Sequence, residues 1–226
     1  MTYLVHKIIC GDCIEVMKEM ESNSMNLVLT DPPYGIGKEG IIGDKKSSVE
    51  HRNWMEKVVY EIERISKDGY FIFHNEVMLF NLASIYKDCR LFASCNNFAI
   101  MGRGMPYAWS PIVFKIKNKK SWLGRGRNWF ISNTAHMVNT PKNIGHPTPK
   151  PIDVIEYLIS MFRSKIILDP FLGSGTISVA AERLGRNSIG IEISKEYCEI
   201  AYKRLLKEVK QTKLNRIPSV IERIGF

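Results

Sequence analysis

Short apolar runs alternate along the chain with longer segments whose apolar residues recur every three or four positions. The short runs predict buried strands and the spaced segments predict amphipathic helices. Strands are predicted at Lys7–Cys10, Leu27–Leu29, Tyr70–Phe73, Ile166–Leu168 and Ser188–Ile191, and helices at residues 54–65, 75–86, 152–162, 176–184 and 194–209. Because strands alternate with helices, we expect an α/β fold: a doubly wound, mostly parallel sheet with helices on both faces.

One part of the pattern departs from this alternation. Phe98–Met101 and Ile112–Ile116 are both apolar runs, but no long helix separates them. Two strands without a crossover helix between them pair antiparallel. The pattern therefore predicts one antiparallel strand in an otherwise parallel sheet.

Composition narrows the class of protein. With 226 residues, 45% of them hydrophobic, the chain can bury one substantial core, so we expect a single domain over residues 1–226. No run of 18 apolar residues occurs and Met1–Ile9 lacks the apolar core of a signal peptide, so we expect a cytoplasmic protein without membrane contact. The five cysteines favour a reducing interior, and Cys10 and Cys13 lack a second pair at zinc spacing, so no metal site is predicted.

Charge is distributed unevenly. No Asp or Glu occurs from Cys89 to Ile152, while ten of the 32 basic residues do, which leaves 22 basic against 23 acidic residues elsewhere. The whole excess of +9 therefore lies in one segment. A block of one sign is typical of a surface that binds a polyanion.

The basic block is densest at Lys115–Arg127, where tryptophans lie among the charges. Cations bind phosphates, and aromatic rings stack on unpaired bases. We therefore interpret residues 117–145 as a small insertion that recognises nucleic acid; aromatic residues packed in the core are the alternative. The candidate contacts are Lys117, Lys119, Lys120, Trp122, Arg125 and Arg127.

The strand at Leu27–Leu29 ends at Asp31-Pro32-Pro33-Tyr34. Two prolines remove two N–H donors and fix two φ angles, so the strand stops there and carbonyls turn out of the sheet. A carboxylate, a free carbonyl and an aromatic ring can together bind an amino group on a planar ring. The alternative is a turn in which Asp31 caps the next segment. The Gly-rich segment Gly35–Ser48 follows and is predicted to be a loop that closes over a substrate.

A second strand ends in a glycine-rich turn, Asp169-Pro-Phe-Leu-Gly-Ser-Gly-Thr176. Glycines allow close approach of a ligand at a helix N-terminus. The turn lacks the Gly-Lys-Ser/Thr of a P-loop, and Ser178 replaces the third glycine of a dinucleotide fingerprint. Of the three nucleotide ligands considered, S-adenosylmethionine remains. Asp169 would accept a hydrogen bond from its amino group, and Glu192, at the end of the next strand, would accept from its ribose hydroxyls.

Together, Asp31–Tyr34 and Ile166–Thr176 resemble the two signature motifs of the DNA amino-methyltransferases, in the order of the permuted β-type class found in restriction–modification systems. The resemblance implies a Rossmann-like fold and methyl transfer from S-adenosylmethionine to a base flipped out of double-stranded DNA. It implies a catalytic role for Asp31, Pro32, Pro33 and Tyr34. It further implies cofactor contacts from Asp12, Asp31, Thr148, Lys150, Asp169, Phe171, Gly173, Gly175, Thr176 and Glu192.

Several points remain open at the level of sequence. Asp12 is placed to cap a helix as well as to contact the cofactor's adenine, and both roles are compatible. Pro149 stands where the family usually has Gln, which removes one hydrogen-bonding group beside Thr148 and Lys150. An Asp at position 31 favours adenine N6 over cytosine N4 as the methylated atom. A catalytically silent DNA-binding subunit and an RNA substrate are further alternatives, and the oligomeric state, a dimer included, is open.

Overall fold

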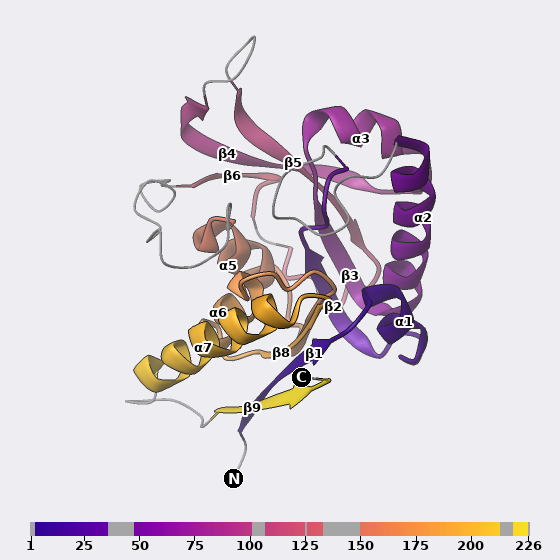
Figure 1. Ribbon diagram of the computed structural model, residues 1–226. Coiled ribbons are helices and arrows are strands. Elements are labelled where there is room, and N and C mark those ends of the chain that lie inside the picture. Colours follow the sequence, from indigo (N-terminus) through magenta and orange to yellow (C-terminus); the bar gives the residue numbers. More distant parts are fainter. Residues whose placement is uncertain are drawn as a thin grey trace.

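The computed structural model describes residues 3–35, 48–100, 107–124, 126–132, 150–212 and 219–225 (Figure 1). One nine-stranded sheet runs through these residues in the order β6-β4-β5-β3-β2-β7-β8-β1-β9. The strands are β1 (Leu4–Cys10), β2 (Met25–Thr30), β3 (Ser66–Phe73), β4 (Arg90–Ile100), β5 (Tyr107–Ile116), β6 (Trp129–Ser132), β7 (Ile166–Asp169), β8 (Asn187–Glu192) and β9 (Ser219–Ile224). The helices are α1 (Cys13–Lys18), α2 (Ser48–Ile65), α3 (Glu76–Leu82), α5 (Ile152–Ser160), α6 (Thr176–Arg183) and α7 (Lys195–Thr212).

Strand direction confirms the predicted fold class. Of the described strands, only β5 runs against the others: it pairs antiparallel with both β3 and β4, and every other pairing is parallel. The predicted antiparallel strand is therefore present as β5, but Ile112 to Phe114 pair with Phe92 to Arg90 and not with Phe98–Met101, because β4 begins at Arg90. Pairing with β5 extends the strand through residues that carry no continuous apolar signal.

Strands β6 and β9 were not predicted, because both lie at sheet edges and carry many exposed residues. β9 pairs with β1 from Leu4 to Ile9, so main-chain hydrogen bonds hold it in place. An edge strand of this kind leaves no apolar run in the sequence to be recognised.

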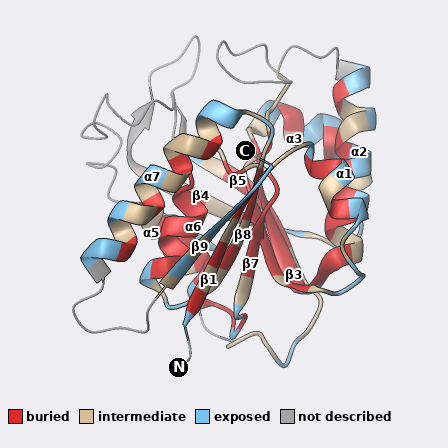
Figure 2. Cartoon of the chain, turned by 60° about the horizontal axis from the view of Figure 1, so that its bottom comes forward, coloured by how far each residue is buried: buried red, intermediate tan, exposed pale blue. Residues whose placement is uncertain are grey.

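Helices cover both faces of the sheet, and the strands between them are the most buried elements (Figure 2). Successive residues of β3 point to opposite faces, as the period of a strand requires. Phe71 and Phe73 pack with α5 and α6, while Tyr70 and Ile72 pack with α1 and α2. No helix among the described residues is long and apolar enough to span a bilayer.

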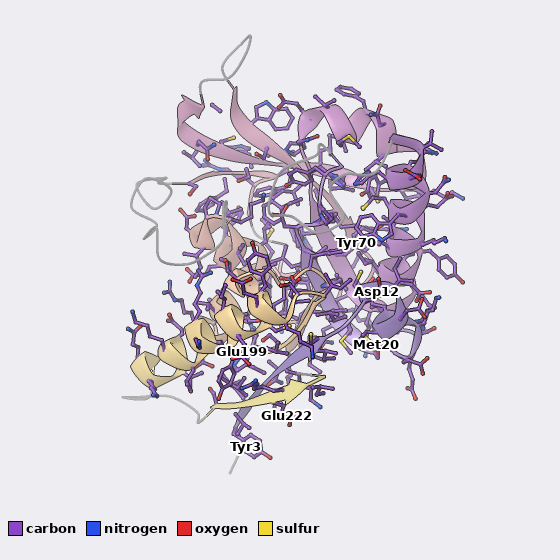
Figure 3. All side chains as sticks on the ribbon, in the orientation of Figure 1. Tyr3, Asp12, Met20, Tyr70, Glu199 and Glu222 are labelled. Carbon is purple, nitrogen blue, oxygen red and sulfur yellow. The ribbon has the colours of Figure 1, made fainter. Side chains whose placement is uncertain are left out.

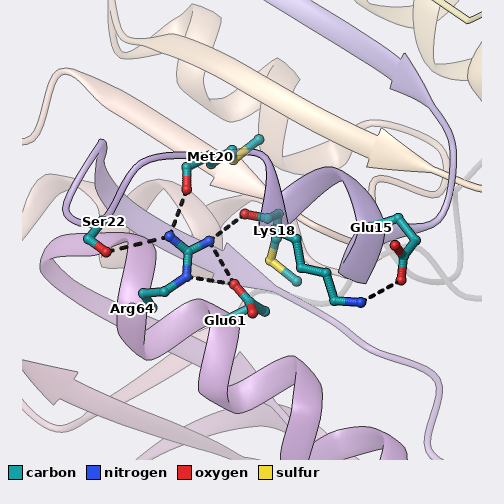
Figure 4. Close-up of polar contacts among 7 residues, drawn as sticks. Glu15, Lys18, Met20, Ser22, Glu61 and Arg64 are labelled. Atoms are coloured by element: carbon teal, nitrogen blue, oxygen red, sulfur yellow. Dashed lines mark hydrogen bonds and ion pairs between the residues drawn. The ribbon is translucent and has the colours of Figure 1, made fainter.

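Arg64, near the end of α2, forms hydrogen bonds to the carboxyl end of the short helix α1 (Figure 4). Its guanidinium donates to the carbonyls of Met17 at 2.6 Å and Met20 at 2.7 Å, and to Glu61 at 2.8 Å. Carbonyls at a helix end have no partner within the helix, so these contacts satisfy groups that would otherwise need water. These hydrogen bonds hold α1 next to α2, and residues of the two helices line a groove between them.

Candidate active site

Four acidic residues lie at the carboxyl ends of four neighbouring parallel strands. Asp31 follows β2, Asp169 closes β7 and Glu192 closes β8. Asp12 lies just beyond β1 at the start of α1 (Figure 3). The sheet order places these strands side by side as β2-β7-β8-β1. Since neighbouring strands are about 4.8 Å apart, the four strand ends span about 14 Å, and the four acidic residues follow one another along this edge. Ligands of open α/β sheets bind at this edge.

The carboxylate of Asp31 has a partner on each oxygen. The Tyr34 hydroxyl donates to Oδ1 at 2.6 Å, and the Lys150 ammonium lies 2.8 Å from Oδ2. Lys150 also lies over the Tyr34 ring, 5.2 Å from its centroid. The resemblance implies a cofactor contact for Lys150, and the structure brings its ammonium to Asp31. The carboxylate is thus held in a fixed orientation, and each oxygen keeps capacity for a further donor.

Helix α2 supports the turn Asp31–Tyr34. His51 is buried, and its Nε2 donates to the Pro33 carbonyl across 2.9 Å. Gly35 passes directly over this imidazole with φ of +71°, and a Cβ there would come within 2.7 Å of the ring. Only glycine combines that conformation with that close approach. The motif gave no indication of His51, because the contact joins residues on two different elements.

His74 follows β3, the strand next to β2. It is buried, hydrogen-bonded through Nε2 to the Tyr86 hydroxyl, and its ring centroid lies 6.4 Å from that of Tyr34. Burial lowers the pKa of His74 to about 4, against a smaller opposing effect of Asp31. His74 is therefore neutral at physiological pH and adds no positive charge beside the turn Asp31–Tyr34.

Asp169 is buried, and its Oδ1 accepts from the Thr30 hydroxyl at 2.8 Å and from the Phe171 N–H at 3.1 Å. Burial raises the pKa of this carboxyl to about 7, because desolvation outweighs the two hydrogen bonds. The Thr30 contact also ties the end of β2 to the end of β7. A cation placed against Asp169 would restore its ionised form.

Glu192 organises the glycine-rich turn. Its Oε2 accepts from the Gly173 N–H and its Oε1 from the Ser194 N–H, both at 2.9 Å. Burial raises the pKa of Glu192, against the effect of these backbone donors. Each oxygen retains a second lone pair, so the carboxylate can accept from two neighbouring hydroxyl groups.

The turn itself allows a ligand to approach the backbone. Gly175 has φ of +79°, and a Cβ there would lie 3.0 Å from Ala201. Arg204 of α7 donates to the Ser174 carbonyl at 3.2 Å and to the Thr176 hydroxyl at 2.8 Å, so α7 supports the turn. Thr176, expected to contact the cofactor, is buried and already engaged by Arg204. The acceptors and the turn together fit S-adenosylmethionine, which has an amino group, two ribose hydroxyls and an adenine amine.

Asp12 caps α1, as its sequence position predicted. Its Oδ1 accepts from the backbone N–H groups of Ile14 at 2.8 Å and Glu15 at 3.2 Å. The residue also lines a groove of about 600 Å³ between α1 and α2. Capping and ligand contact therefore remain compatible for this residue.

The basic segment divides into two groups of residues. The Lys117 ammonium donates to the carbonyls of Glu63 at 2.5 Å and Ser66 at 2.6 Å, and Trp122 packs edge-on against the buried ring of Phe162. Lys119, Lys120 and Arg127 are exposed, and the Arg127 guanidinium lies over the Trp129 ring. Arg125, Thr148, residues 133–145 and residues 36–47 of the predicted loop Gly35–Ser48 lie outside the described residues.

Comparison with known proteins agrees with this arrangement. The sequence model of a family described as DNA methylase matches residues 25–107 and 103–203. The type II methyltransferase M.HpaI of Haemophilus parainfluenzae is 29% identical over 96% of this chain and 78% of its own length.

Two solved structures share the fold. A putative DNA modification methylase of Thermus thermophilus, TTHA0409, solved with S-adenosyl-L-methionine, has a TM-score of 0.66 at 20% identity, covering 97% of this chain and 98% of its own. The cytosine-N4-specific PvuII DNA methyltransferase has a TM-score of 0.69 at 17% identity, covering 97% and 96%. With the family match covering most of the chain and the fold in agreement, the chain belongs to the DNA methylase family, the amino-methyltransferases that act on N6 of adenine or N4 of cytosine with S-adenosylmethionine as methyl donor.

Proposed function

We propose that this chain methylates the exocyclic N6 of adenine in DNA. The row of four carboxylates on β2, β7, β8 and β1 supports methyl transfer, because it aligns the catalytic acceptor with the cofactor acceptors along one edge. The choice of adenine over cytosine rests on the Asp at position 31, which the family resemblance associates with adenine. Asp169 binds the cofactor's amino group, Glu192 its ribose hydroxyls and Asp12 its adenine amine. When bound, S-adenosylmethionine supplies an electrophilic methyl group on a sulfonium. Asp31, on the neighbouring strand, then faces the target nitrogen.

The catalytic turn makes the target amine more nucleophilic. The lone pair of an exocyclic amine is delocalised into the ring, so acceptors aimed at its two hydrogens favour the pyramidal form in which the lone pair is free. The Asp31 carboxylate accepts one hydrogen and the Pro32 carbonyl the other. Tyr34 and Lys150 fix the Asp31 oxygens at 2.6 and 2.8 Å, so the acceptor is preorganised.

The target base has to leave the helix stack to reach this edge, because its amine is inaccessible within a duplex. The Tyr34 ring, next to Asp31, offers a surface on which the flipped base stacks. Exposed Lys119, Lys120 and Arg127 bind phosphates of the flanking DNA, whereas Lys117 and Trp122 have their partners within the fold.

Nucleoside analysis of DNA from cells that express the chain tests the proposal. In a host without adenine methylation of its own, we expect N6-methyladenine with the wild type and far less with Asp31→Ala. Accumulation of N4-methylcytosine instead would assign the chain to cytosine. Cofactor binding without transfer of a labelled methyl group to duplex DNA would indicate a silent subunit, and transfer to RNA alone would exclude DNA as substrate.

A further inference from the structure

Helix α2 contributes a tryptophan, Trp54, to the lining of the groove between α1 and α2. Trp54 is half-buried, and the groove is about 600 Å³ in volume. Its lining residues are Asp12, Ile14, Glu15, Lys18, Glu50, Asn53, Trp54 and Lys57. The two helices lie side by side along the same face of the sheet (Figure 1).

Trp54 is also in contact with the glycine-rich turn. Its ring meets that of Phe171 edge-on, with centroids 5.5 Å apart and an interplanar angle of 65°. Phe171 lies two residues after Asp169, within the turn that the cofactor approaches. The indole therefore joins the groove to the turn, and it also contacts the His51 ring, with centroids 5.8 Å apart.

The position of the groove along the row of carboxylates indicates which part of a ligand reaches it. Proceeding from Asp31 through Asp169 and Glu192, the last carboxylate is Asp12, which lines the groove. Asp12 uses Oδ1 for the two backbone donors of α1, so among the described contacts Oδ2 keeps its capacity for a ligand N–H. A carboxylate beside an indole matches a planar heterocycle that carries an exocyclic amine.

We propose that Trp54 is a further cofactor-binding residue, which packs on the adenine ring while Asp12 accepts from its amino group. The inference rests on the proposed use of S-adenosylmethionine but assigns a residue that neither signature motif contains. Trp54 reaches the site from α2, one helical turn after His51, which holds the catalytic turn through Pro33. The same helix face therefore supports the catalytic turn and contributes to the cofactor pocket.

Calorimetry with S-adenosylhomocysteine on wild type, Trp54→Phe and Trp54→Leu tests this assignment. Loss of one aromatic stack weakens binding by about tenfold or more, so we expect that loss for Trp54→Leu and a change of only a few-fold for Trp54→Phe. Tyr60→Leu is the matched control, because Tyr60 is an exposed aromatic residue (67%) on the same helix that does not line the groove. Equal affinities for wild type and Trp54→Leu would overturn the assignment.

Fluorescence supplies a second readout that does not depend on Trp54→Leu folding. The chain has four tryptophans, and the other three, Trp109, Trp122 and Trp129, lie on or beside β5 and β6. We expect S-adenosylhomocysteine to change the emission of the wild type and to leave that of Trp54→Phe unchanged. An undiminished response in Trp54→Phe would place the ligand elsewhere. If the wild type itself fails to bind S-adenosylhomocysteine, the result counts against the proposed function. If the wild type binds and the Trp54 variants bind with the same affinity, the result counts only against this inference.

Discussion

Two regions of the molecule carry the residues that its sequence singles out: the carboxyl ends of β2, β7, β8 and β1, and the basic segment around β5 and β6. At the strand ends, Asp31, Asp169 and Glu192 lie on one edge, and each has a partner distant in the sequence: Lys150 for Asp31, Thr30 for Asp169 and the Gly173 N–H for Glu192. In the basic segment, Lys117 is bound to two carbonyls of the α2–β3 junction, while Lys119 and Lys120 are exposed. Residues of a motif at a strand end lie together at one edge of the sheet, as the motif predicts. Counting basic residues along the sequence does not distinguish the exposed lysines, which can bind DNA, from a lysine such as Lys117 that is bonded within the fold.

The largest effect is expected at Asp31. Replacing it by alanine removes one preorganised acceptor in the transition state, so turnover should fall by about 10²–10³ or more. Single-turnover transfer of a labelled methyl group to duplex DNA measures this, while calorimetry should find cofactor affinity changed far less. Glu222→Gln, at an exposed carboxylate on β9, is the control and should behave as wild type. Near-normal turnover in Asp31→Ala would remove Asp31 from the chemistry.

For Glu192 we expect the opposite result: the substitution should lower cofactor affinity, whereas the Asp31 substitution lowers turnover. Glu192→Ala removes the acceptor for ribose hydroxyls and also releases the Gly173 N–H from its 2.9 Å contact. Hydrogen bonds to a charged group contribute about 1.5–3 kcal/mol each, so cofactor affinity should fall by about tenfold or more. Calorimetry on the two proteins measures the loss. Unchanged affinity would mean that Glu192 serves the turn alone.

Asp169 predicts a dependence of cofactor affinity on pH. Burial raises the pKa of Asp169 to about 7, so in the cofactor-free protein this carboxyl is protonated at pH values below about 7. An ammonium group binds the ionised form, so affinity should fall as the pH drops below about 7, by up to about tenfold per unit. In Asp169→Asn only the titration of the ligand itself should remain. Identical pH profiles for the two proteins would exclude Asp169 as the amino-group acceptor.

The same shift has a consequence for stability. A carboxyl whose pKa is raised in the folded protein binds a proton there but not in the unfolded chain, where its pKa is about 3.9. The contribution of Asp169 to stability is therefore present at low pH and declines as the pH rises from about 4 to about 7. Urea denaturation of the cofactor-free protein across this window, with Asp169→Asn as the control, measures it.

The smallest effects separate the two groups of lysines. Lys119→Gln with Lys120→Gln should weaken DNA binding on all sequences and reduce the slope of log affinity against log salt by about 1.8, or 0.9 for each phosphate contact. Lys117→Met should leave that slope unchanged and instead lower the free energy of unfolding by about 1–3 kcal/mol, because two carbonyls lose a charged donor. A salt slope altered by Lys117→Met would return this residue to the DNA interface.

The sequence by itself determined the local features. Pro32 and Pro33 end a strand wherever they occur, glycines at positions 173 and 175 permit a close backbone approach, and apolar spacing distinguishes strands from helices. These effects act over a few residues, so they can be recognised without the fold. They were sufficient to predict the parallel sheet, its one reversed strand and the carboxylates at three of its strand ends.

Tertiary structure decided which of these local features meet. Thr30 and Asp169 are 139 residues apart, and their hydrogen bond exists only because β2 and β7 are neighbours in the sheet. His51, Lys150 and Lys117 likewise acquire their partners from other elements, by contacts with no periodic signature. Strand order depends on the packing of the whole core, whereas sequence periodicity reports only whether each residue is buried. The row of acids was therefore predictable one residue at a time, and its assembly into a site followed from the fold.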